Sequence, residues 1–98
     1  MYLKIHESQK GKIIAVCDKE LIGQIFEDIN GYMDLDRYRS FYIGELKSEI
    51  EIKNALNSFD SVNLVGKKSV KIALDLKLIE KSQIKFISKI PYIQIFNL

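Results

Sequence analysis

The first 17 residues constrain the fold most, because they hold two strand patterns on either side of a turn. Residues 2–7 alternate, with Leu3 and Ile5 on one face, which is typical of a half-buried strand. Residues 12–17 are rich in apolar and β-branched side chains, which favours a more buried strand. Gly11 ends the polar segment between them and can take a positive φ. These features predict an N-terminal β-hairpin.

Two later segments have the apolar spacing of helices. The first covers residues 49–58, where Ser48 and Glu51 have the three-residue spacing of a capping box. Its apolar stripe consists of Ile52, Ala55, Leu56 and Phe59. The second predicted helix covers residues 67–76, and its buried face consists of Val70, Ala73 and Leu74.

The C-terminal half also predicts strands. Residues 61–65 are a short apolar segment that ends at Gly66. Residues 83–96 are dense in Ile and Phe and predict two further strands, in which Pro91 must lie at an edge, a bulge or a strand start.

The middle of the chain is less clear. Residues 19–27 allow two alternatives, since Gly23 disfavours a continuous helix: a helix capped by Asp18, or one helical turn followed by a short strand. Residues 32–35 predict a short strand, and an irregular loop follows through Gly44.

Together these elements predict a single domain over residues 1–98, since a chain of 98 residues has no room for two independent cores. The expected fold is a small two-layer domain of the α/β or α+β class. Its mixed sheet starts with the N-terminal β-hairpin, and it has two main helices, at about residues 49–58 and 67–76.

Composition narrows the classes of function. A lone cysteine, Cys17, and a lone histidine, His6, exclude a four-ligand zinc site and a disulfide within the chain. No apolar segment approaches the ~18 residues of a membrane span. We therefore expect a cytoplasmic protein without a metal, a cofactor or a membrane partner. The sequence offers no catalytic residues, and a non-enzymatic function is favoured.

Charge is distributed unevenly. Residues 1–49 hold 7 basic and 9 acidic side chains, a net charge of −2, whereas residues 50–98 hold 8 and 4, a net charge of +4. A basic C-terminal half could meet phosphate. The alternative is an ordinary solvated lysine-rich surface.

The first candidate site is the junction between the predicted strand 61–65 and the helix after it. Gly66, Lys67, Lys68 and Ser69 open this helix, and Lys71 lies one turn further. Backbone N–H groups at a helix start attract anions, and two lysines there oppose the helix dipole unless an anion compensates them. This pattern indicates a site for phosphate or an RNA backbone. Alternatively, Gly66 only forms a tight turn and the lysines are solvated.

The second candidate site is the aromatic segment 35–45. It contains the chain's two arginines, Arg37 and Arg39, beside Tyr38, Phe41 and Tyr42. Aromatic rings and guanidinium groups are what proteins use to recognise single-stranded RNA. Alternatively, the aromatic residues pack in the core and the arginines pair with nearby carboxylates.

Four blocks of the sequence resemble a small archaeal family. They are Lys12–Glu27, Ser40–Glu45, Asn63–Gly66 and Ile90–Phe96, and their ordered set is similar to the family called domain of unknown function four-two-four. The resemblance covers nearly the whole chain. It implies a small stand-alone cytoplasmic protein with no assigned activity, and it supplies no catalytic residue.

The leading hypothesis is therefore a module that binds RNA or a ribonucleoprotein. One alternative is a domain that binds a nucleotide or another small phosphate-bearing ligand. Another is a structural adaptor that forms a homodimer through an edge strand within residues 83–96.

Overall fold

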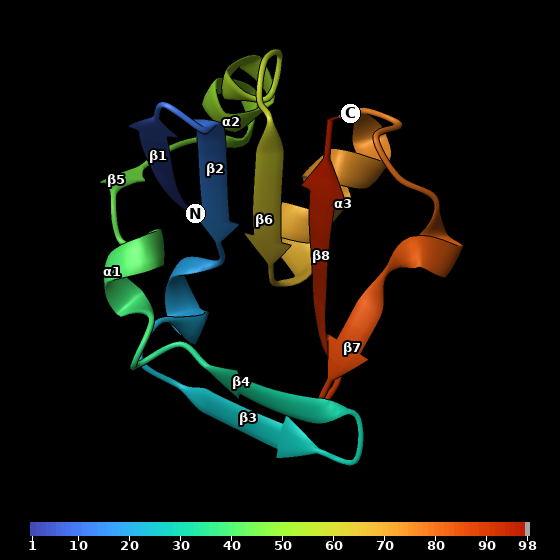
Figure 1. Cartoon of the computed structure of the whole chain (residues 1–98). Coiled ribbons are helices and arrows are strands. Elements are labelled where there is room, and N and C mark those ends of the chain that lie inside the picture. The colour runs from blue at the N-terminus through green and yellow to red at the C-terminus, as the bar shows by residue number, and fades with distance from the viewer. Residues whose placement is uncertain (98) are drawn as a thin grey trace.

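A six-stranded mixed sheet forms the centre of the protein in the computed structural model, which describes residues 1–97 (Figure 1). Its strand order is β5-β1-β2-β6-β8-β7. The strands are β1 (Tyr2–Ser8), β2 (Gly11–Cys17), β5 (Glu45–Leu46), β6 (Ser61–Val65), β7 (Lys85–Ile87) and β8 (Ile90–Phe96). Among the described strands of this sheet, β2 and β6 are the parallel pair, and the other neighbours are antiparallel.

The predicted N-terminal hairpin is confirmed. β1 and β2 pair from Tyr2↔Cys17 to Ser8↔Gly11, so the turn is two residues long. Gly11 has φ of +120°, and a Cβ at this position would lie 2.4 Å from Asp60 Oδ2. Glycine is therefore required for the backbone conformation and for the close approach.

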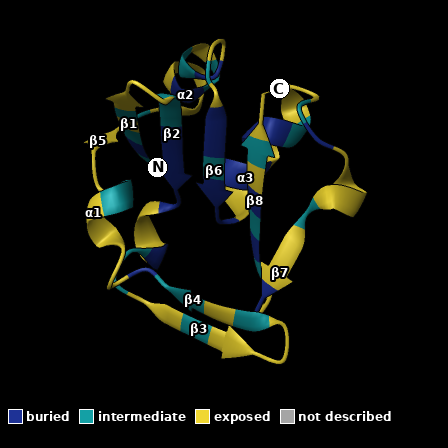
Figure 2. Ribbon diagram, in the orientation of Figure 1, coloured by how far each residue is buried: buried dark blue, intermediate teal, exposed yellow. Residues whose placement is uncertain are grey.

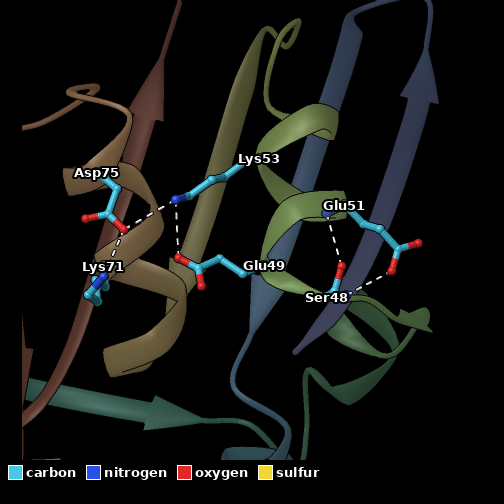
Figure 3. Close-up of polar contacts among 6 residues, drawn as sticks. All are labelled: Ser48, Glu49, Glu51, Lys53, Lys71 and Asp75. Carbon is cyan, nitrogen blue, oxygen red and sulfur yellow. Dashed lines mark hydrogen bonds and ion pairs between the residues drawn. The ribbon is translucent and has the colours of Figure 1, made fainter.

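Both main helices are also confirmed, as α2 (Glu49–Ala55) and α3 (Lys67–Asp75). The capping box is complete: Glu51 N donates to Ser48 Oγ at 3.2 Å, and Ser48 N donates to Glu51 Oε1 at 3.1 Å (Figure 3). Lys53 joins the two helices, since its Nζ lies 3.2 Å from Glu49 Oε1 on α2 and 3.5 Å from Asp75 Oδ2 on α3. Helix α2 ends three residues before the predicted boundary.

The two helices cover one face of the sheet and enclose the main core. Alternate residues of the central strands face them, and these side chains are almost fully buried: Ile14, Val16, Val62 and Leu64 (Figure 2). Ile52 and Leu56 of the α2 segment and Val70, Ile72 and Ala73 of α3 complete this core. The α+β class and the mixed sheet are therefore as expected.

Residues 19–34 form one helical turn followed by strands, the second of the two alternatives. A short 3-10 turn, η1 (Lys19–Leu21), precedes β3 (Ile25–Asp28) and β4 (Gly31–Asp34), which pair as a separate two-stranded sheet. Gly23 lies between η1 and β3. Its φ is +88°, a conformation that a helix does not allow. The β3–β4 hairpin runs below the main sheet in Figure 1.

The predicted irregular loop before Gly44 is wrong in part, because residues Arg39–Tyr42 form a short helix, α1. It lies on the sheet face opposite α2 and α3, against β1 and β2. At the C-terminal end, a 3-10 turn, η2 (Lys81–Gln83), precedes β7. β7 is an edge strand, whereas β8 lies between β6 and β7. Within residues 1–97, no helix is long and apolar enough to cross a membrane.

Candidate aromatic binding site

A pocket with a volume of about 480 Å³ opens on the sheet face opposite the two main helices. Five aromatic side chains line it: Tyr32, Tyr38, Phe41, Tyr42 and Tyr92. The remaining lining consists of Met33, Asp34, Leu35, Val65 and Ile87. The pocket therefore combines β4, the α1 segment and the ends of β6, β7 and β8.

The pleat of the sheet places the floor of this pocket. Val65 pairs with Cys17 on one side and with Tyr92 on the other, and Tyr92 pairs with Lys85. Paired residues of adjacent strands point to the same face, so these four side chains form one row. Cys17 and Val65 are the last residues of the parallel strands β2 and β6, whereas Lys85 begins β7 and Tyr92 lies near the start of β8.

Contacts from β1 hold α1 over this face. His6 Nε2 lies 2.9 Å from the carbonyl oxygen of Phe41, and the two rings stack with centroids 4.6 Å apart. Lys4 Nζ donates to the carbonyl oxygen of Ser40 at 2.6 Å. These bonds satisfy carbonyl groups that a four-residue helix leaves without partners. The hairpin thus positions Phe41 and Tyr42, whose rings meet edge to face.

The two ionisable groups buried near the floor have raised pKa values. Burial raises the pKa of Tyr42 to about 12 and that of Cys17 to about 12. Both groups are therefore protonated at neutral pH, and Cys17 is fully buried. A thiol in this state is a poor nucleophile. Among residues 1–97, no three His, Cys, Asp or Glu side chains are grouped to hold a metal ion.

Asp34 is the charged residue of the pocket. Its Oδ1 accepts from Asp36 N at 3.1 Å and from Arg37 N at 2.7 Å, and its Oδ2 accepts from the Tyr32 hydroxyl at 3.2 Å. These bonds, led by the one from Arg37 N, lower the pKa of Asp34. The carboxylate is thus ionised at neutral pH and accepts hydrogen bonds only.

The first predicted site, at the start of α3, already has an anion from within the chain. Asp18 is buried, and its carboxylate accepts from Lys68 N at 3.0 Å, Ser69 N at 2.8 Å and Ser69 Oγ at 2.7 Å. Gly66 has φ of +107°, and a Cβ there would lie 2.3 Å from Asp18 Cγ. The prediction that Asp18 caps a helix beginning at residue 19 is wrong, because it makes no side-chain cap bond there.

Binding of an external anion at these amides remains a prediction, and it would require Asp18 to leave. Lys67 and Lys68 are exposed beside a hollow of about 250 Å³, but Asp18 and Glu20 line the same hollow. Lys71 is directed to its own helix, where its Nζ lies 2.9 Å from Asp75 Oδ2 (Figure 3). Asp18 thus places a negative charge at the start of α3, where the two lysines led us to expect phosphate or an RNA backbone.

The second predicted site lies at the pocket. Tyr38, Phe41 and Tyr42 line it, and the Arg37 guanidinium lies 5.6 Å from the centroid of the Tyr38 ring. Arg39 instead forms an exposed ion pair with Asp36. Tyr32, Asp34 and Tyr92 also line this site, and the sequence did not predict them there. Tyr92 could have been added by pairing the strand that begins near Pro91 antiparallel to residues 61–65, because this register places Tyr92 beside Val65.

Comparisons with known proteins agree with this fold. The structure is similar to the crystal structure of an uncharacterized conserved protein from Methanopyrus kandleri, with a TM-score of 0.81 and 20% sequence identity over 99% of this chain and 90% of that chain. At this identity the likeness concerns the fold alone. No curated protein matches the chain. The sequence pattern of the family described as Protein of unknown function (DUF424) matches residues 6–98, and the chain therefore belongs to that family.

Proposed function

We propose that this protein is a non-enzymatic, cytoplasmic module that binds single-stranded RNA by stacking a base in the aromatic pocket. The observation that carries the proposal is the gathering of five aromatic side chains around one opening of about 480 Å³. Stacking of a base on an aromatic side chain contributes ~1–3 kcal/mol and tolerates any sequence. The pocket volume also lies in the range of small-ligand sites.

Basic side chains flank the pocket where a backbone would enter and leave. Arg37 lies over the Tyr38 ring on one side. Lys85 pairs with Tyr92 on the other side, and both line a second hollow of about 450 Å³ with Asn30 and Phe86. Phosphate contacts from lysine and arginine fix the register of a bound strand without reading its sequence.

The open part of the sheet extends the surface beyond the pocket. Asn63 and Gln94 pair two residues further along β6 and β8 and therefore share the face of Val65 and Tyr92. Gln94 is exposed, and Phe96, on the same face, is 61% exposed. Side-chain amides bond to base edges, and an exposed ring offers a second stacking surface. A bound strand can thus continue along β8.

A short labelled single-stranded RNA of mixed sequence tests the proposal by fluorescence anisotropy at low salt. Tyr38 is 54% exposed, so Tyr38→Ala should leave the fold intact. We expect this change to weaken binding by about 5- to 150-fold, the loss of one stacking contact. The matched control is Tyr38→Phe, which keeps the ring and should bind like the wild type.

Salt dependence provides the second measurement. Arg37→Ala and Lys85→Ala should each reduce the slope of log affinity against log salt by about 0.7, the value for one contact to a single strand. Lys53→Gln, on the helical face, should not change the slope. Absence of RNA binding at low salt, or equal binding by Tyr38→Ala, would contradict the proposal. Binding of free mononucleotides but not of RNA would favour a nucleotide-binding domain instead.

A further inference from the structure

We infer that Asp34 makes the aromatic pocket select bases with an exocyclic amino group, namely adenine, cytosine and guanine, against uracil. This inference rests on the proposed function, because it names the part of the RNA that enters the pocket. The observation that carries it is the hydrogen-bonding capacity that Asp34 and Tyr32 leave open.

Asp34 is the charged side chain among the ten residues that line the pocket. Its Oδ1 accepts from two backbone N–H groups, those of Asp36 and Arg37, so both lone pairs of this oxygen are engaged. Among residues 1–97, its Oδ2 accepts a hydrogen bond only from the Tyr32 hydroxyl. One lone pair of Oδ2 therefore remains for a ligand.

Tyr32 reinforces the same polarity. Its hydroxyl proton is donated to Asp34, and this bond raises the pKa of Tyr32. The phenolic oxygen can then only accept a further bond. At neutral pH this side of the pocket presents a carboxylate acceptor beside a hydroxyl acceptor, and a ligand must supply the donors.

The four RNA bases differ in the hydrogen-bond donors that they can offer to these acceptors. The amino groups of adenine, cytosine and guanine donate, and acidic side chains accept from the cytosine amino group in known recognition. The pairing edge of uracil carries one N–H between two carbonyl oxygens. These carbonyl oxygens would face the acceptor oxygens of Asp34 and Tyr32. Each carbonyl would then lose its hydrogen bond to water and gain no hydrogen bond from the protein in return.

The substitution Asp34→Asn tests this polarity. An asparagine Oδ1 can still accept from the amides of Asp36 and Arg37, so the turn is preserved, while an amino group replaces Oδ2. We expect the wild type to bind short adenine and cytosine homopolymers at least about 5-fold more tightly than uracil homopolymers, the low end for one good base contact. In Asp34→Asn this ratio should fall to about one or reverse, because uracil carbonyls accept from the new donor.

Two further variants keep the test decisive. Asp36→Asn removes one negative charge, as Asp34→Asn does, but from the exposed ion pair of Asp36 with Arg39. It should raise the affinity for all homopolymers without changing the ratio of their affinities. Tyr32→Phe keeps both the ring and Asp34, and it should retain the preference against uracil.

The outcomes separate the inference from the proposed function. RNA binding with equal affinity for all homopolymers, or with the same preference in the wild type and Asp34→Asn, would overturn the inference and leave the proposed function standing. No binding of any homopolymer at low salt would overturn both.

Discussion

Replacing Asp18 with alanine should lower the free energy of unfolding more than replacing an exposed carboxylate residue with alanine. The Asp18 side chain is 3% exposed and accepts three hydrogen bonds at the start of α3. Ser69, which makes two of these bonds, is fully buried. Asp18→Ala therefore removes the cap of α3 and takes away the carboxylate to which the buried Ser69 amide and hydroxyl donate.

The magnitude follows from these contacts. A buried donor left unsatisfied costs ~1–3 kcal/mol, and two such groups remain on Ser69. The lost cap of Lys68 N contributes ~0.5–2 kcal/mol. Together these contributions predict that the free energy of unfolding falls by about 2.5–8 kcal/mol. A domain of this size loses ~4–8 °C of melting temperature per kcal/mol, so the melting temperature should fall by at least about 10 °C.

Urea unfolding monitored by circular dichroism measures this loss. Asp18→Asn should cost less than Asp18→Ala, because Oδ1 still accepts from both Ser69 groups. Asp36→Ala, at an exposed ion pair, is the control and should change stability little. A loss below about 1 kcal/mol for Asp18→Ala would refute the assignment of Asp18 as the anion that compensates the start of α3.

Three further predictions follow from the core and from α1. Leu56 is 4% exposed in the main core, so Leu56→Ala should lower the free energy of unfolding by ~2–5 kcal/mol, and an unchanged urea midpoint would show that this face is not core. Cys17, with its pKa raised to about 12 by burial, should react with a thiol reagent only after denaturant is added; rapid labelling of the native protein would disagree. His6→Ala removes the contact with Phe41, so amide hydrogen exchange should accelerate in α1 but not in α2; equal rates in α1 would show that His6 does not hold it.

The elements that the sequence predicts correctly are those whose physical signal is local. The capping box of Ser48 and Glu51 and the alternation of residues 2–7 each depend on neighbours a few residues away. The turn between β7 and β8 lacked such a signal. Ser88 and Lys89 have φ of 48° and 66°, a conformation that glycine or asparagine usually marks, so the sequence predicted two strands without locating their turn.

The features that were missed depend on contacts between distant residues. Aspartate is a common helix cap, as expected for Asp18, but the helix that it caps begins after residue 66. The pairing of β2 with β6 brings Asp18 to the start of this helix. Helix α1 has four residues and no apolar period, and it is held by Lys4 and His6. The aromatic pocket was only half predicted, because Tyr92 reaches it through sheet register.

The parallel pairing of β2 with β6 also bears on how fast the protein folds. Its first partners, Ile13 and Ser61, are 48 residues apart, so closing this loop costs about 3 kcal/mol of chain entropy before any contact between the strands repays it. The β1–β2 hairpin, with its two-residue turn, has almost no such cost. We therefore expect the hairpin to form early and the bond from Ser69 to Asp18 to form after the transition state. Stopped-flow mixing of Asp18→Ala should accordingly show faster unfolding with an unchanged refolding rate, whereas slower refolding would place the parallel pair in the folding nucleus.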